Sequence, residues 1–100
     1  MTREHDIIKI ADYYGLKHQS QIAIEELSEL IKAICKFNRA ENSTEVQYER
    51  MNIVEEIADV EIMLFQLKYM LDINPNVVID AKVTRQLDRI KKEIKEKKNV

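Results

Sequence analysis

Glycine, proline and cysteine each occur only once in this chain, and tryptophan is absent. Because Gly and Pro interrupt helices, a chain with one of each has few natural break points. Val, Thr and aromatic residues are also sparse beside Ile, Leu, Glu and Lys, a balance that favours helix over strand. The single cysteine, Cys35, cannot form an intrachain disulfide, so a reducing cytoplasm is the expected compartment.

A strong excess of charge is also lacking. The 18 acidic and 16 basic residues give a formal net charge of −2, which supplies no general reason to expect binding to nucleic acid or to a membrane surface. The charged N-terminus has no apolar run of the signal-peptide kind, and no window approaches the roughly 20 apolar residues of a membrane span. The sequence therefore predicts a soluble, cytoplasmic protein.

What the chain does have is many hydrophobic residues for its length. Its 100 residues are expected to form one domain, over residues 1–100. A chain of this size buries only about 60–70% of the surface that its unfolded form exposes. Yet 45% of the residues are hydrophobic, more than a small monomer hides easily. The excess predicts burial between subunits, in a homodimer or a homotetramer.

The few break points divide the chain into four expected helices. The first runs from about Arg3 to Tyr14 and ends at Gly15, a natural C-cap. The others cover about residues 19–39, 46–72 and 75–96, with a polar loop at 41–44 and Asn74 and Pro75 as N-cap and first helical residue of the last. Short connections favour antiparallel neighbours, so the sequence predicts an all-α, antiparallel bundle of about four helices, completed by oligomerisation.

Apolar side chains recur at spacings of three and four residues along three of these helices, the pattern of a bundle seam. The expected seam residues are Ala23, Leu27, Leu30, Ile34 and Phe37 in the second helix, Ile53, Ile57, Val60, Leu64, Leu67 and Leu71 in the third, and Ile79, Val83, Leu87, Ile90 and Ile94 in the fourth. The third helix is also apolar away from its seam, which predicts burial against a second copy of the chain.

A short acidic pattern occurs twice, at residues 25–30 and 55–60. Both segments read acid, acid, apolar, small, acid, apolar. At about 100° per residue, Glu26 and Glu29 lie roughly 60° apart on one helix face, and Glu56 and Asp59 are related in the same way. If the two helices pack antiparallel through their seams, all four carboxylates converge at one edge of the interface.

Four converging carboxylates repel one another and lose hydration, so they need a positive partner. Ligation by oxygen alone, without His or Cys, indicates a hard divalent cation such as Mg²⁺ or Mn²⁺. Acidic residues at helical spacing more often form a solvated face. Two copies of the pattern, each in register with a seam, favour the metal site.

These residues resemble a known family. Glu25-Glu26-x-x-Glu29 followed by Glu56-x-x-Asp59 is similar to the paired motif of the MazG-like nucleotide pyrophosphohydrolases, in the all-α NTP pyrophosphatase superfamily, and the resemblance covers about residues 15–89. It implies hydrolysis of a nucleoside triphosphate between the α and β phosphates, giving a monophosphate and pyrophosphate.

The resemblance also implies roles for individual residues. Glu26, Glu29, Glu56 and Asp59 would be magnesium ligands. Either Glu25 or Glu55 would orient or deprotonate the water that attacks the α phosphorus. Lys82 and Arg85 would bind phosphates, and a second subunit would complete the nucleotide pocket. By their position near the acidic patterns, and not from the resemblance, Gln19, Gln21, Met63 and Met70 are candidates for contact with the base.

Two other classes of protein compete with this interpretation. A di-iron or di-manganese carboxylate bundle usually contains Glu-x-x-His motifs, and neither acidic pattern here includes a His. A non-catalytic helical interaction module, with its acids in a solvated stripe, is the stronger alternative. That alternative predicts a protein that is indifferent to Mg²⁺.

Overall fold

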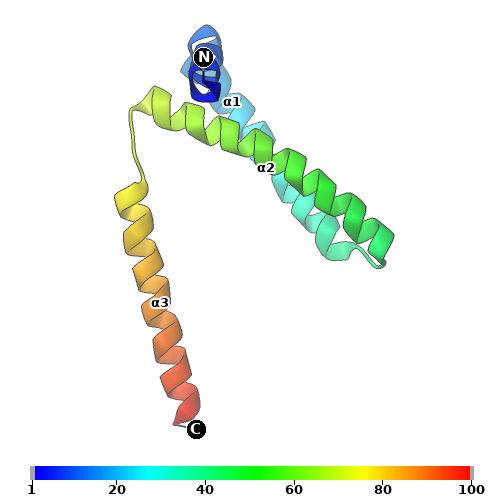
Figure 1. Cartoon of the computed structure of the whole chain (residues 1–100), viewed down its shortest axis with the longest axis vertical. Coiled ribbons are helices and arrows are strands. Elements are labelled where there is room, and N and C mark those ends of the chain that lie inside the picture. Colours follow the sequence, from blue (N-terminus) through cyan, green and yellow to red (C-terminus); the bar gives the residue numbers. More distant parts are fainter. Residues whose placement is uncertain (1, 100) are drawn as a thin grey trace.

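The computed structural model describes residues 2–99, which form three helices and no strand. These are α1 (Arg3–Arg39), α2 (Ser43–Leu71) and α3 (Asn76–Lys98). Figure 1 shows α1 and α2 side by side in antiparallel orientation, with α3 pointing away from both. The predicted all-α fold is confirmed. None of the helices within residues 2–99 is both long enough and apolar enough to cross a membrane.

Gly15 interrupts α1 at the position where the first helix was predicted to end. Its φ of 83° and ψ of 166° lie in a region of backbone conformation that is essentially restricted to glycine. The chain therefore bends sharply there, and the next helical segment begins directly after the bend rather than at Gln19 or Ser20. The segment 3–14 packs back onto the rest of the fold, since Ala11 is completely buried.

The other helix boundaries differ from the prediction by a few residues. α2 begins at Ser43, inside the predicted loop, because the Asn42 side chain caps it by accepting a hydrogen bond from the Glu45 amide at 2.9 Å. Pro75 is the N-cap of α3 and not its first helical residue. Asn74 still satisfies one backbone amide at the start of α3, since its Oδ1 accepts a hydrogen bond from the Asn76 amide at 3.0 Å.

The core lies between α1 and α2 and follows the predicted seams in part, since Ala23 and Val60 belong to those seams. Ala23, Ala33, Val60 and Met63 are buried, as are the polar residues Gln19 and Gln66. By contrast, four predicted seam residues remain 41–45% exposed, namely Leu27, Ile34, Ile57 and Leu64. Ala33 and Met63, each four residues after a member of the acidic patterns, are buried as well, so the contact extends toward the acidic side of each helix.

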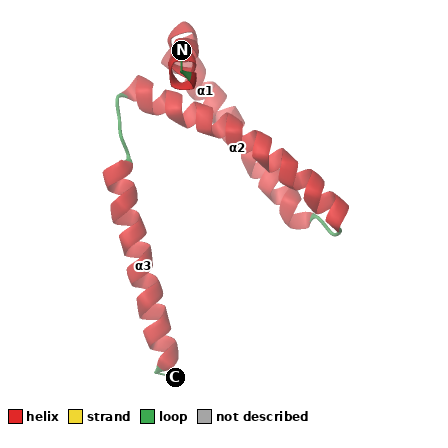
Figure 2. Cartoon of the chain, viewed as in Figure 1, coloured by secondary structure: helices red, strands yellow, loops and turns green. Residues whose placement is uncertain are grey.

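α3 does not pack against α1 or α2 in the part of the chain that the structure describes. Figure 2 shows it as a separate helix beyond a short loop. The radius of gyration of 18.5 Å exceeds the ~13 Å of a compact domain of this length. The apolar residues of the predicted α3 seam are therefore 49–54% exposed, and the expected bundle does not form within one chain.

Candidate metal centre

Three carboxylates from the two acidic patterns meet at the interface of α1 and α2. Glu26 comes from α1, and Glu56 and Asp59 come from successive turns of α2. One oxygen of each side chain lies within 4.8 Å of the corresponding oxygens of the other two. Glu26 and Glu56 are half-buried and Asp59 is exposed. These three residues, called the carboxylate cluster below, were all predicted as metal ligands.

Glu29, the fourth predicted ligand, lies at the rim of this group. Its side chain is 53% exposed, and its Oε1 is 3.4 Å from Nζ of Lys32 on the same helix. An exposed ion pair of this spacing contributes only about 0.3–0.5 kcal/mol, so a divalent cation can readily displace the lysine. The negative charge of Glu29 already acts on Glu26 across one turn of α1.

The electrostatics of the carboxylate cluster favour a cation. Burial raises the pKa of Glu26 above its usual value, and the neighbouring charges of Asp59, Glu56 and Glu29 raise it further, together with a hydrogen bond to Asp59. Oε2 of Glu56 is buried without any hydrogen-bond partner, and no other buried side-chain nitrogen or oxygen in residues 2–99 lacks one. Leaving a buried polar atom unpaired costs about 1–3 kcal/mol, and more if the group is charged.

A hard divalent cation fits these residues. The donors are carboxylate oxygens alone, which is the ligand set that Mg²⁺ and Mn²⁺ accept and that zinc or copper sites usually supplement with His or Cys. A cation bound there would pair with the unpartnered oxygen of Glu56 and would offset the repulsion that raises the pKa of Glu26. Three or four carboxylates also leave coordination positions free for water and substrate.

The remaining predicted site residues lie outside the carboxylate cluster. Glu25 and Glu55 are exposed next to the ligands on their respective helices. Lys82 and Arg85 lie on α3, where they line a hollow of about 200 Å³ together with Gln86 and Arg89. Because α3 does not pack against α1 or α2, this basic group is not brought to the carboxylate cluster of its own chain.

Several residues suggested as base contacts have other surroundings in the fold. Gln19 is 5% exposed, and its Nε2 donates a hydrogen bond to Oε1 of Gln66, so its amide is not free to reach a base. Met63 is buried between the helices, which makes it a core residue. Gln21 is exposed and Met70 is half-buried.

Sequence reasoning did not identify a buried polar network beside the carboxylate cluster. His18 Nδ1 lies 2.6 Å from Gln19 Oε1, Gln19 Nε2 donates to Gln66 Oε1 at 2.8 Å, and Gln66 Nε2 donates to the Ile7 carbonyl at 3.1 Å. The sequence feature that could have predicted this network is the spacing of the two glutamines from the acidic residues. Gln19 precedes Glu26 by one heptad and Gln66 follows Asp59 by one heptad, so both amides lie on the helix faces that carry the carboxylates.

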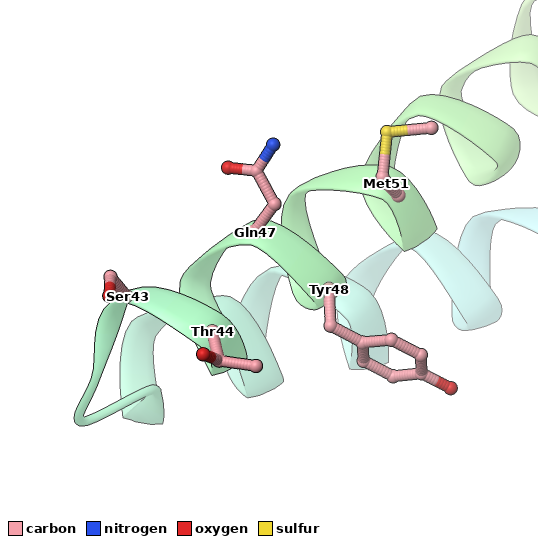
Figure 3. A pocket seen from close by; sticks show the side chains of 5 residues that line it. All are labelled: Ser43, Thr44, Gln47, Tyr48 and Met51. Carbon is pink, nitrogen blue, oxygen red and sulfur yellow. The ribbon is translucent and has the colours of Figure 1, made fainter.

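A surface hollow of about 550 Å³ lies elsewhere, at the beginning of α2. Figure 3 shows its five lining side chains, Ser43, Thr44, Gln47, Tyr48 and Met51, all projecting from that one helix. It is therefore an open depression along a helix and not a cleft between elements. It contains no carboxylate and no cationic group, so nothing in its lining matches the chemistry of the carboxylate cluster.

Comparison with known proteins does not assign the chain to a family. No protein-family model matches the chain, and no curated protein or solved structure is significantly similar to it. The carboxylate cluster is therefore the feature from which a function is proposed.

Proposed function

We propose that this chain is a Mg²⁺-dependent nucleoside triphosphate pyrophosphohydrolase of the MazG-like type. The observation that carries the proposal is the convergence of Glu26, Glu56 and Asp59 within 4.8 Å, with one buried oxygen of Glu56 left without a partner. The reaction itself comes from the sequence resemblance. A ribo- or deoxynucleoside triphosphate is hydrolysed to the monophosphate and pyrophosphate.

In this proposal Glu26, Glu29, Glu56 and Asp59 hold Mg²⁺, for which Mn²⁺ substitutes. When bound by these residues, the ion would screen the phosphate charge and lower the pKa of a nearby water. Glu25 or Glu55 orients the attacking water and accepts its proton, since each is an exposed carboxylate that directly precedes a proposed ligand in the sequence. Water adds in line to the α phosphorus, the bond from that phosphorus to the bridging oxygen breaks, and pyrophosphate leaves.

The proposed enzyme is a homodimer or a homotetramer. Apolar side chains of the predicted seams remain exposed on α3 and, on separate surfaces, on α1 and α2. Exposed apolar patches of this kind usually mark interfaces. Lys82 and Arg85 lie on the helix that does not reach its own carboxylate cluster. Their phosphate-binding role is therefore proposed for the site of a neighbouring subunit.

The direct test is a product analysis with a panel of ribo- and deoxynucleoside triphosphates. The protein is incubated with Mg²⁺ or with EDTA, and the products are separated by ion-exchange chromatography. Glu56→Gln and Asp59→Asn variants are compared with the control Glu93→Gln, which changes an exposed acid on α3. We expect monophosphate and pyrophosphate only with Mg²⁺, with activity lost in the first two variants and kept in the control.

The other outcomes distinguish the alternatives. Diphosphate and orthophosphate as products would retain the metal site but contradict the bond assignment. An absence of turnover with every nucleotide, together with a melting temperature that does not respond to Mg²⁺, would favour the non-catalytic interaction module.

A further inference from the structure

Lys32 is a positive side chain in contact with one of the predicted metal ligands. Its Nζ lies 3.4 Å from Oε1 of Glu29, and no other cation within residues 2–99 forms an ion pair with an acidic side chain. The charges that act on Glu26 are those of Asp59, Glu56 and Glu29, which are all negative. Lys32 is thus the one cation paired with this group of acids, and the sequence resemblance assigns it no role.

The register of the two helices places this ion pair across from the unpartnered oxygen of Glu56. Glu26 on α1 shares a hydrogen bond with Asp59 on α2, and the two helices are antiparallel (Figure 1). Glu29 lies three residues after Glu26, and Glu56 lies three residues before Asp59. Because both helices rise equally per residue, Glu29 and Glu56 lie opposite each other as well. Lys32 therefore stands beside the part of the carboxylate cluster where Oε2 of Glu56 is buried without a partner.

The exposed edge of this group of acids is negative apart from Lys32. On α1, Glu25, Glu29 and Lys32 fall within a sector of about 60° around the helix axis, and all three are exposed. Asp59 is the exposed member of the carboxylate cluster on α2. An anion that approaches from solvent is repelled by these carboxylates and attracted by Lys32 alone.

We infer that Lys32 binds a phosphate oxygen of the ligand that the metal holds. In the metal-free chain its ammonium group is paired with Glu29. A divalent cation that takes Glu29 as a ligand releases this ammonium group, whose three N–H donors are then free at the rim of the site. A phosphate bound to the metal supplies acceptor oxygens, and a charge-assisted hydrogen bond replaces the lost ion pair.

Lys32 would therefore oppose metal binding and favour phosphate binding. These two effects have opposite signs, and a purely structural role of Lys32 would not produce them. The inference rests on the metal site of the proposed function, but it can be tested without any turnover.

The test consists of two binding measurements on the full chain. The affinity for Mn²⁺ is obtained from the electron paramagnetic resonance signal of the free ion. The affinity for inorganic tripolyphosphate is obtained by calorimetry at a saturating concentration of Mg²⁺. The variants are Lys32→Gln and Lys32→Arg, and folding should tolerate both because Lys32 is 66% exposed. The control is Lys17→Gln, which removes the same charge from an exposed position on the side of α1 opposite Glu26.

We expect Lys32→Gln to bind tripolyphosphate at least about fivefold more weakly, while its Mn²⁺ affinity stays the same or tightens by up to about threefold. Lys32→Arg keeps the charge and should stay within about threefold of wild type for both ligands. Lys17→Gln should stay within about twofold.

An unchanged tripolyphosphate affinity in Lys32→Gln, or an equal loss in Lys17→Gln, would overturn the inference. A loss of Mn²⁺ affinity parallel to the loss of tripolyphosphate affinity would also overturn it, because the change would then have damaged the metal site. A wild-type protein that binds both ligands as expected but hydrolyses no nucleoside triphosphate would instead overturn the proposed function and leave the role of Lys32 intact.

Discussion

The side chain of Gln19 donates a hydrogen bond of 2.8 Å to the side chain of Gln66, and both residues are almost completely buried between α1 and α2. Gln66 also holds the Ile7 carbonyl, so one amide connects α2 to the parts of α1 on both sides of the Gly15 bend. Buried amides are stable only when their hydrogen bonds are satisfied. This pair therefore fixes the register of α1 against α2, and with it the approach of Glu26 to Asp59.

Replacing Gln66 with leucine tests the contribution of this pair. Gln66→Leu keeps a similar volume but leaves the buried Gln19 amide and the Ile7 carbonyl without that partner. We expect the free energy of unfolding, measured by urea denaturation, to fall by about 1–3 kcal/mol. The double variant Gln19→Leu/Gln66→Leu should lose less free energy of unfolding than the sum of the losses in the two single variants, because it removes both partners together.

The control is Gln21→Leu, a change at an exposed position on α1. Its free energy of unfolding should stay within about 0.5 kcal/mol of wild type. Additive losses in the double variant would contradict coupling between the two amides.

A side chain at Gly15 is expected to destabilise the fold, although there is space for one. An added Cβ would meet no atom within 4 Å, but the φ of +83° is strained for any other residue. We predict that Gly15→Ala lowers the free energy of unfolding by about 1–3 kcal/mol through backbone strain alone. It should also increase hydrogen exchange in the segment 3–14, which the bend positions. Normal stability and unchanged exchange in this variant would show that the bend is not required.

The raised pKa of Glu26 makes stability depend on pH when no metal is present. Because the folded chain holds the Glu26 proton to higher pH than the unfolded chain, folding is favoured below the ordinary pKa of about 4.5 and loses this contribution as pH rises through the folded value. In EDTA, stability should therefore fall from about pH 4.5 toward neutrality. Glu26→Gln should reduce that fall, and Mg²⁺ should oppose it in the wild type, since a cation favours the ionised carboxylate.

Urea midpoints recorded across this pH range, with EDTA and with Mg²⁺, measure the effect. Glu25→Gln is the control, because Glu25 is exposed on the same helix outside the carboxylate cluster. An identical pH dependence in the wild type and in Glu26→Gln would exclude Glu26 as its source.

The carboxylate cluster was largely predictable from the sequence, because helix periodicity and a short connection determine its geometry. The spacing of Glu56 and Asp59 places both on one face, and the hairpin of α1 and α2 brings Glu26 opposite them. The position of the interface on each helix was not predictable from apolar periodicity. Leu27 and Ile57 belong to the predicted seams, but Ala33, Met63 and the buried amide pair draw the contact toward the acidic side of each helix and leave those two residues exposed. The position of α3 was not predictable for a different reason. Its apolar face indicates that α3 packs against another surface, but the pattern does not identify that surface.

The role proposed for α3 is tested by mixing two inactive variants. Asp59→Asn removes a metal ligand from the carboxylate cluster, and Arg85→Ala removes a phosphate-binding cation from α3. If Arg85 serves the site of the partner subunit, a mixed dimer contains one site with both residues intact. After subunits exchange at a 1:1 ratio, half of the chains are in mixed dimers and half of the sites in those dimers are complete. Activity should then recover to about a quarter of wild type, as followed by pyrophosphate release.

The control mixture combines Asp59→Asn with Glu56→Gln. Both changes lie on α2 within one carboxylate cluster, so no mixed dimer has a complete site and activity should stay at the level of the separate variants. Light scattering on the mixed samples establishes that the chains associate. Recovery in neither mixture, with association shown, would place Arg85 at the site of its own chain. An Arg85→Ala variant that keeps full activity by itself would place Arg85 outside the site. Recovery in the first mixture alone would mean that α3 contributes its basic side chains across the subunit interface, which accounts for its separation from α1 and α2 in the single chain.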